Sequence, residues 1–202
     1  FQFNTINNEF VAEPRLGLKI PSGEKGSLNF GFGIHSQLQP KNVYFDQFLD
    51  ENTGDYHMTN RDVGYTRSMH YVGGYDYLIS NNFRLKLETY FQHLYNIPVK
   101  ESFPEFSMIN AGDQFGLPRE SDLINKGKGK NYGIEFTLEK FLSKGYYFLF
   151  TSSIFQSKYT GYDGIWRNTA FNGNFVFNLL GGYEFNLGEK TMITLDTKTV
   201  FA

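Results

Sequence analysis

Acidic residues gathered in one segment supply a first set of side chains that could bind a ligand. Asp46, Asp50, Glu51 and Asp55 make the segment 46–55 acidic, and His57 follows it. Carboxylate oxygens are hard ligands for cations, so Asp50, Asp55 and His57 are candidate contacts for a cation or a cationic ligand. The spacing matches no calcium-binding loop, and a solvated acidic loop stays open as the second interpretation.

Three aromatic residues close together in the sequence form a second candidate set. Tyr159, Tyr162 and Trp166 fall in or beside a short segment that we expect to be a loop. Aromatic rings stack on sugar rings and other flat ligands, and they equally anchor a protein at a lipid interface. Both interpretations stay open from the sequence.

The remaining residue types give no sign of catalysis or of a bound cofactor. The four histidines are scattered without a pair at metal-binding spacing, and cysteine is absent. No Gly-x-Ser-x-Gly motif occurs. The net charge of −2 gives no electrostatic argument for nucleic acid. We therefore expect no enzyme, no cofactor, no metal site and no nucleic-acid partner.

The elements that must position these residues are predicted by a period of two in the apolar residues. Leu28, Phe30, Phe32 and Ile34 alternate with small or polar residues, as do the apolar residues of 132–138 and 83–87. Such alternation is typical of strands with one apolar and one polar face. We predict eight strands, near 10–20, 27–38, 66–78, 83–96, 130–141, 146–158, 171–187 and 191–201, with a bend in the seventh at Gly181-Gly182.

The connections between these strands alternate strictly between short and long. Short turns are predicted at 21–26, 80–82, 143–145 and 188–190, and long connections at 39–65, 97–129 and 159–170. Outer-membrane barrels have short periplasmic turns and long extracellular loops. Strands of the predicted length can cross a membrane. The sequence therefore predicts an all-β, antiparallel, up-and-down transmembrane β-barrel in the bacterial outer membrane, here a partial barrel of about eight strands.

The two faces of each strand then have different surroundings. We expect Phe30, Phe32, Ile34, Ile134, Phe136 and Leu138 to face lipid, and Arg84, Glu88, Glu135 and Glu139 to face a wet interior. With the short turns periplasmic, both chain ends lie on the extracellular side. Complete bacterial barrels keep both ends periplasmic, and no signal peptide opens the chain. We therefore expect residues 1–202 to be an internal or C-terminal-half excerpt of one barrel domain.

A basic stretch precedes the fifth predicted strand. Lys126, Lys128 and Lys130 are separated by Gly127 and Gly129. This stretch could attract the phosphates of lipopolysaccharide or could simply be a solvated strand entry. It lacks the first glycine and the Lys-Ser/Thr ending of a phosphate-binding loop.

Several strings resemble the barrels of TonB-dependent receptors of the Bacteroidetes. They include residues 13–38, Asn131 to Glu135, Leu138 to Phe141, Trp166 to Asn174, and Leu179 to Gly182. The resemblance implies a barrel of about 22 strands with a plug domain in its lumen. It also implies import of a nutrient cargo, with energy from the TonB complex. The strings belong to the scaffold and identify no cargo.

Other functions remain open beside that of a TonB-dependent nutrient receptor. The chain could be a complete small outer-membrane barrel with an adhesive or structural role, or a soluble β-sandwich that binds carbohydrate. A barrel enzyme is the fourth possibility, and the lack of a catalytic set argues against it.

Overall fold

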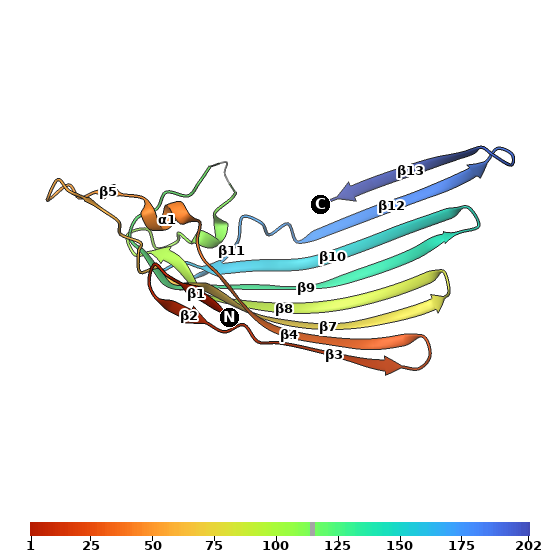
Figure 1. The fold of residues 1–202 in the computed structure, drawn as a ribbon, viewed down its shortest axis with the longest axis horizontal. Helices are drawn as coiled ribbons and strands as arrows, with labels where there is room; N and C mark the ends of the chain where they lie inside the picture. Colours follow the sequence, from red (N-terminus) through yellow and green to blue (C-terminus); the bar gives the residue numbers. More distant parts are fainter. Residues whose placement is uncertain (114–115) are drawn as a thin grey trace.

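The computed structural model describes residues 1–113 and 116–202, and their main feature is one antiparallel meander (Figure 1). Each long strand pairs with its neighbours along the chain, from β3 at one edge to β13 at the other. The short strand β11 (Trp166–Asn168) pairs with β10 beside this path. The long strands are β3 (Arg15–Ser22), β4 (Gly26–Gln37), β7 (Thr66–Ser80), β8 (Phe83–Lys100), β9 (Leu123–Ser143), β10 (Tyr146–Thr160), β12 (Phe175–Asn186) and β13 (Met192–Phe201).

These eight long strands confirm the predicted fold class and strand order. Strand β8 ends at Lys100 rather than near 96, β12 begins at Phe175 rather than near 171, and two other strand ends differ more. The first predicted strand is interrupted at Pro14, which separates β2 (Glu9–Val11) from β3, because proline cannot donate to a strand ladder. The fifth begins at Leu123 rather than near 130. Its basic stretch hides the strand in the sequence, because lysine stands at the positions in phase with the apolar residues of 132–138 and glycine stands between the lysines.

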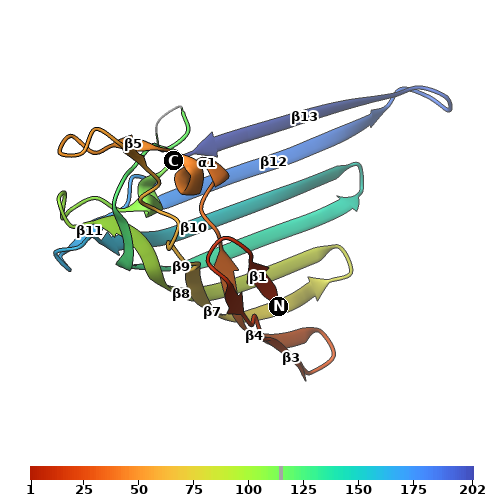
Figure 2. The same cartoon turned by 60° about the vertical axis from the view of Figure 1, so that its left-hand side comes forward.

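Short and long connections lie at opposite ends of the sheet, as predicted (Figure 1). The turn after β9 uses Lys144 and Gly145 in left-handed conformations, with φ of 54° and 79°, which suit a tight hairpin. The long connections contain small elements (Figure 2). These are helix α1 (Lys41–Phe45), the hairpin of β5 (Phe48–Leu49) with β6 (Tyr56–His57), and the 3-10 turn η1 (Met108–Asn110). The hairpin of β1 (Gln2–Asn4) with β2 precedes β3 at the N-terminal end.

The register of the strands places the predicted residue sets on opposite faces of the sheet. Phe136 lies opposite Leu87, whereas Glu135 lies opposite Glu88. Side chains alternate between faces along a strand, so the apolar and charged sets named above lie on separate faces, as predicted. We call these the apolar face and the polar face. Large side chains of the apolar face stay exposed, including Ile134 at 56% and Ile154 at 62%.

The polar face carries a network of paired charges. Arg84 forms an ion pair with Asp76, and its guanidinium lies 3.7 Å from Glu139. Lys86 pairs with Glu88. Adjacent strands supply most of these partners, so the network links β7, β8 and β9 across the ladder. Such a wall suits contact with water.

The predicted bend at Gly181-Gly182 is wrong. Strand β12 keeps its register through both glycines against β10 and against β13. Gly182 serves a close approach instead, because a Cβ at this position would collide with the Tyr147 ring and with Asp196 Oδ1. The Tyr147 hydroxyl donates to that oxygen at 2.6 Å, so the missing side chain leaves space for a hydrogen bond across the polar face.

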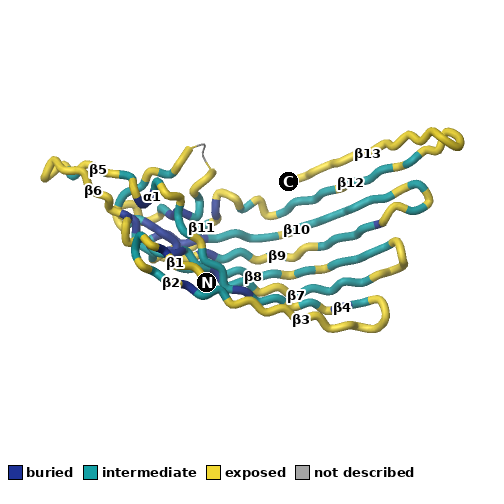
Figure 3. The backbone as a smooth tube through the Cα atoms, in the orientation of Figure 1, coloured by how far each residue is buried: buried dark blue, intermediate teal, exposed yellow. Residues whose placement is uncertain are grey.

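Buried side chains gather at the end with the long connections (Figure 3). The apolar cluster there consists of Val43, Tyr44, Val63, Met108 and Leu123. No second sheet covers the apolar face within residues 1–113 and 116–202, which argues against the soluble β-sandwich. Over the same residues, no helix has the length and apolar character to span a membrane.

Candidate ligand-contact site at the loop end

The long connections hold one another through the buried amide of Asn60. This side chain is 1% exposed. Its Nδ2 donates to the carbonyl oxygens of Val43 (3.0 Å) and Glu120 (2.5 Å). Its Oδ1 accepts a hydrogen bond from the Leu123 backbone N–H at 3.0 Å. One side chain therefore joins α1, the connection before β7 and the connection before β9.

Ion pairs fasten the same segments from the outside. Lys100 Nζ lies 2.8 Å from Glu120 Oε2, and Arg119 Nε lies 3.3 Å from Asp46 Oδ2. The first pair ties the end of β8 to the connection that follows it. The second ties this connection to the residue after α1. The loop end is thus an ordered unit with its own core and its own polar links.

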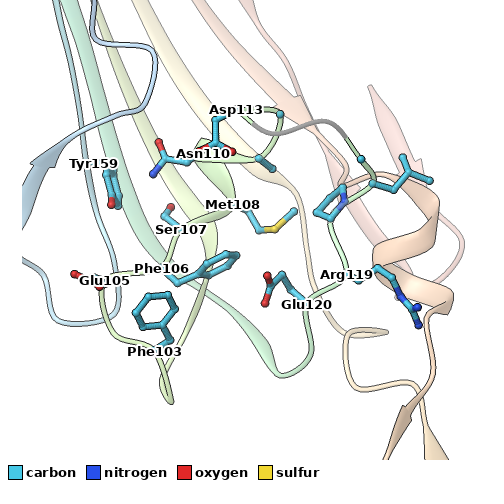
Figure 4. Close-up of a pocket in the computed structure, with 15 residues that line it drawn as sticks. Phe103, Glu105, Phe106, Ser107, Met108, Asn110, Asp113, Arg119, Glu120 and Tyr159 are labelled. Atoms are coloured by element: carbon cyan, nitrogen blue, oxygen red, sulfur yellow. The ribbon is translucent and has the colours of Figure 1, made fainter.

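A cavity of about 460 Å³ opens in the connection between β8 and β9 (Figure 4). The rings of Phe103 and Phe106 line it, with centroids 6.4 Å apart, and Tyr159 of β10 closes another side. Its size is in the range of small-molecule sites. Rings at the wall offer stacking surfaces for a flat or sugar-like ligand.

Carboxylates at the same cavity add a charge preference. Glu105, Asp113 and Glu120 belong to the lining. Glu120 is engaged by Lys100, whereas no ion pair involves Glu105 or Asp113 in the described part of the chain. The cavity therefore combines apolar rings with free negative charge. It suits a small ligand that carries hydroxyl groups or positive charge.

A second cavity of about 480 Å³ lies beside the N-terminal hairpin, and its polar groups serve the fold. Glu9 Oε2 accepts from the Tyr65 backbone N–H at 3.0 Å. Asn125 Oδ1 accepts from the Gly64 N–H at 2.8 Å, and its Nδ2 donates to the Asn96 carbonyl oxygen at 2.7 Å. These groups are already bonded, so we assign the cavity a structural role.

The predicted acidic candidates lie together on the exposed β5–β6 hairpin, away from the cavity residues. The Asp50 N–H donates to the Asp55 carbonyl oxygen at 2.9 Å, and His57 pairs with Phe48 in the ladder. The Asn52 N–H donates to the Asp50 carboxylate at 2.9 Å, which lowers the pKa of Asp50. Among the described residues no group of three or more acidic, histidine or cysteine side chains could hold a metal ion.

The three predicted aromatic candidates point to three different places. Tyr159 is buried at the cavity. The Tyr162 hydroxyl donates to Glu101 at 2.7 Å, and this bond to a carboxylate raises the pKa of Tyr162. Trp166 pairs with Thr160 on the apolar side of the sheet and lies under Lys130 Nζ at 4.3 Å. Only Tyr159 of the candidate set lines the cavity.

The sequence analysis missed every cavity residue except Tyr159, and three of them, Phe103, Glu105 and Phe106, come from the string Glu101-Ser-Phe-Pro-Glu-Phe106. It alternates acidic and aromatic residues inside a predicted extracellular loop, and that mixture was an available signal. The structure also brings together two histidines that are far apart in the sequence. The rings of His35 and His70 meet edge to face at 4.8 Å on the polar face, because Gly33 of β4 lies opposite His70 of β7.

Comparisons with known proteins give a likeness of fold. No family model matches the chain, and no curated protein matches it. Among solved structures, the chain is similar to the FrpB iron transporter from Neisseria meningitidis, with a TM-score of 0.56 and 15% sequence identity. The match covers 87% of this chain and 24% of the transporter chain. The meander therefore shares its fold with about a quarter of that transporter chain.

Proposed function

We propose that this chain forms part of the wall and the extracellular loops of an outer-membrane barrel that takes up a nutrient in a TonB-dependent manner. The observation that carries the proposal is the pair of unlike faces. One face exposes large apolar side chains, and the other carries paired charges. Exposed apolar surface of this extent needs lipid or a partner to cover it. The likeness to an iron transporter supports transport as the task of such a wall.

The partners of this proposal follow from the resemblance in the sequence. They are outer-membrane lipid, a plug domain in the lumen, the TonB energising complex and a nutrient cargo of unknown identity. The strings from Trp166 to Asn174 and from Leu179 to Gly182 support the Bacteroidetes type of receptor within this class. The role is one of binding and passage, without covalent chemistry.

The cavity of the β8–β9 connection is the proposed first contact for the cargo. It combines an exposed ring, Phe103, with the unpaired carboxylate of Glu105 at the end of the sheet that faces the outside in this proposal. The β5–β6 hairpin with Asp50, Asp55 and His57 is the competing contact, because it lies at the same end.

A deletion strain complemented with the gene tests this function. The strain is grown under limitation for iron chelates, vitamins, saccharides or peptides in turn, with and without TonB. The wild-type gene is expected to restore growth on one class of nutrient, only when TonB is present. Restoration without TonB, or a protein absent from the outer membrane, would contradict the proposal.

Two variants locate the contact. Phe103→Ala with Glu105→Gln changes exposed positions and is expected to weaken uptake about tenfold, as for the loss of one stacked ring and one charged contact. Tyr56→Ala removes an exposed ring from the β5–β6 hairpin (Tyr56 is 65% exposed and Phe103 51%), and it should leave uptake unchanged. The reverse result would move the contact to the hairpin.

A further inference from the structure

The lysines of the Lys126–Lys130 stretch lie on the outside of the sheet because the glycines between them must lie inside. Gly127 pairs with Ile97, and a Cβ on Gly127 would lie 2.5 Å from Val99 Cγ1. A Cβ on Gly129 would lie 2.9 Å from Ile109 Cδ1. The loop core fills this inner side. Side chains alternate along a strand, so Lys128 and Lys130 project from the opposite side, which continues the apolar face.

Neighbouring strands extend this basic group into a row. Lys130 lies directly opposite Lys158 of β10 and opposite His93 of β8. Cross-strand partners have Cβ atoms about 5 Å apart, and like charges in this position repel each other. In the part of the chain that the structure describes, no ion pair involves Lys128, Lys130 or Lys158. The row therefore holds several uncompensated positive charges side by side.

The row stands directly above the apolar part of the same face. On β9 the outward side chains from Tyr132 through Ile134 and Phe136 to Leu138 are apolar, and Lys140 follows at the turn. The step from Lys130 to Lys140 covers ten residues, which is about 33 Å along a strand. At the usual barrel tilt of about 40° this corresponds to about 25 Å along the membrane normal, the height of the apolar band of outer-membrane barrels. Lys130 and Lys128 therefore lie at the level of the outer head groups.

At the short-turn end of the band, the lysine at the boundary, Lys140, is buried and fully hydrogen-bonded. Lys140 is 6% exposed, and its Nζ donates to the carbonyl oxygens of Ser143 (2.9 Å) and Tyr146 (2.8 Å). Its charge is satisfied by its own turn. At the loop end, Lys128 and Lys158 have no such carbonyl partners among the described residues, so their charge is available to a ligand on this face.

An aromatic ring completes the basic row. Trp166 is 43% exposed, and Lys130 Nζ lies over its ring at 4.3 Å. Indole rings favour the membrane interface, where one side is apolar and the other is wet. Trp166 thus offers a surface for a sugar ring next to ammonium groups that bind phosphate.

We propose that Lys128, Lys130, Lys158 and His93, with Trp166, form a site on the outer wall for the phosphorylated glucosamine head group of a lipopolysaccharide. This proposal rests on the outer-membrane placement proposed above. Phosphate neutralises the adjacent ammonium groups, the sugar ring packs on the indole, and the acyl chains lie along Ile134 and Ile154 below. Glycine stands at 127 and 129 because side chains of the loop core, such as Val99 and Ile109, occupy the space where a Cβ atom would lie.

The test uses the full-length protein as its gene encodes it, purified from outer membranes in detergent and stripped of lipid. Binding of bisphosphorylated lipid A in mixed micelles is compared with binding of its dephosphorylated form. The wild-type protein is expected to prefer the phosphorylated lipid at least tenfold. The variant Lys128→Gln, Lys130→Gln, Lys158→Gln should lose this preference, and the matched Arg variant should keep it.

A control variant, Lys25→Gln, Lys144→Gln, Lys190→Gln, removes the same charge from the short turns at the other end of the sheet and should bind like wild type. If the triple Gln variant fails to fold, the salt dependence of wild-type binding replaces it, because charge attraction weakens as salt rises. Equal affinity of the wild-type protein for both lipids would overturn the site, as would retained preference in the folded Gln variant. If either of these results is found for a protein that still fractionates with the outer membrane, the lipid site is wrong but the proposed function is not contradicted.

Discussion

Replacement of Asn60 by alanine should open the loop end while leaving the sheet intact. Truncation removes three hydrogen bonds to backbone groups and a longer one from the Thr59 hydroxyl (3.4 Å), and it leaves the carbonyl oxygens of Val43 and Glu120 and the N–H of Leu123 without their partner. The site is almost fully buried, with Asn60 1% exposed. Each unsatisfied buried group costs about 1–3 kcal/mol. Because water can enter the vacated space and satisfy part of this, we expect a total of about 3 kcal/mol.

That free energy corresponds to an opening equilibrium about 100-fold more favourable, since a factor of ten is about 1.4 kcal/mol. Hydrogen exchange followed by mass spectrometry on the full-length protein measures it directly. Peptides that cover 40–65 and 101–123 should exchange about 100-fold faster in Asn60→Ala. Peptides that cover 132–139 of β9 should not change, because the ladder there has no contact with Asn60.

Asn82→Ala is the matched control, because Asn82 is exposed on a short turn and its described hydrogen bonds use backbone atoms. It should exchange like wild type everywhere. Unchanged exchange in the loop peptides of Asn60→Ala would refute the reasoning that one amide holds the connections together. Faster exchange of the 132–139 peptide as well would show that loop end and sheet open as one unit.

Three further outcomes follow from the register and the packing. In native membranes, a spin label at Phe136 should be more accessible to lipid-soluble oxygen than one at Glu135, and the reverse order would contradict the assignment of the faces. Gly127→Ala should destabilise the folded protein by about 1–3 kcal/mol by overpacking, as measured by denaturant unfolding in detergent. Gly17→Ala, with open space around its Cβ position, should change stability by less than about 0.5 kcal/mol. The 202-residue chain alone, reconstituted in vesicles, should show no energy-dependent uptake. The reason is that the edge strands β3 and β13 have unpaired backbone groups, which lipid cannot satisfy. Energy-dependent uptake by these vesicles would contradict this reasoning and favour a self-sufficient small barrel.

The sheet was predictable because local signals agree along most of its length. Alternation of the type Leu28, Phe30, Phe32 marks each strand, and short polar turns fix which strands pair. The register then follows, because a slip by one residue would exchange the two faces. The early start of β9 was missed because its alternation is inverted. Above the band, small residues face inward and lysines face outward.

The loop end was not predictable for a different reason. Its core joins Val43 and Val63 of the β4–β7 connection to Met108 of the β8–β9 connection and to Leu123 at the start of β9, and no periodicity links them. Tyr159 and Trp166 are neighbours in the sequence, yet they fall on opposite faces. Their proximity in the sequence suggested a single aromatic site, but the alternation of side chains along the strands places the two rings at separate sites. The amide of Asn60 gives no local sign of its role, because its backbone partners lie 17, 60 and 63 positions away.

Strand β9 runs 21 residues, about 70 Å at the usual rise per residue, so the β8–β9 hairpin stands well beyond the apolar band. This length has an evolutionary consequence. The connections pack on an apolar core and hydrogen bonds of their own, so substitutions there leave the apolar band of the sheet undisturbed. With the outer-membrane placement proposed above, we therefore expect the surface of the loop end to diverge faster than the apolar band. Homologous sequences should show this as a step in divergence rate along β9, near Lys130.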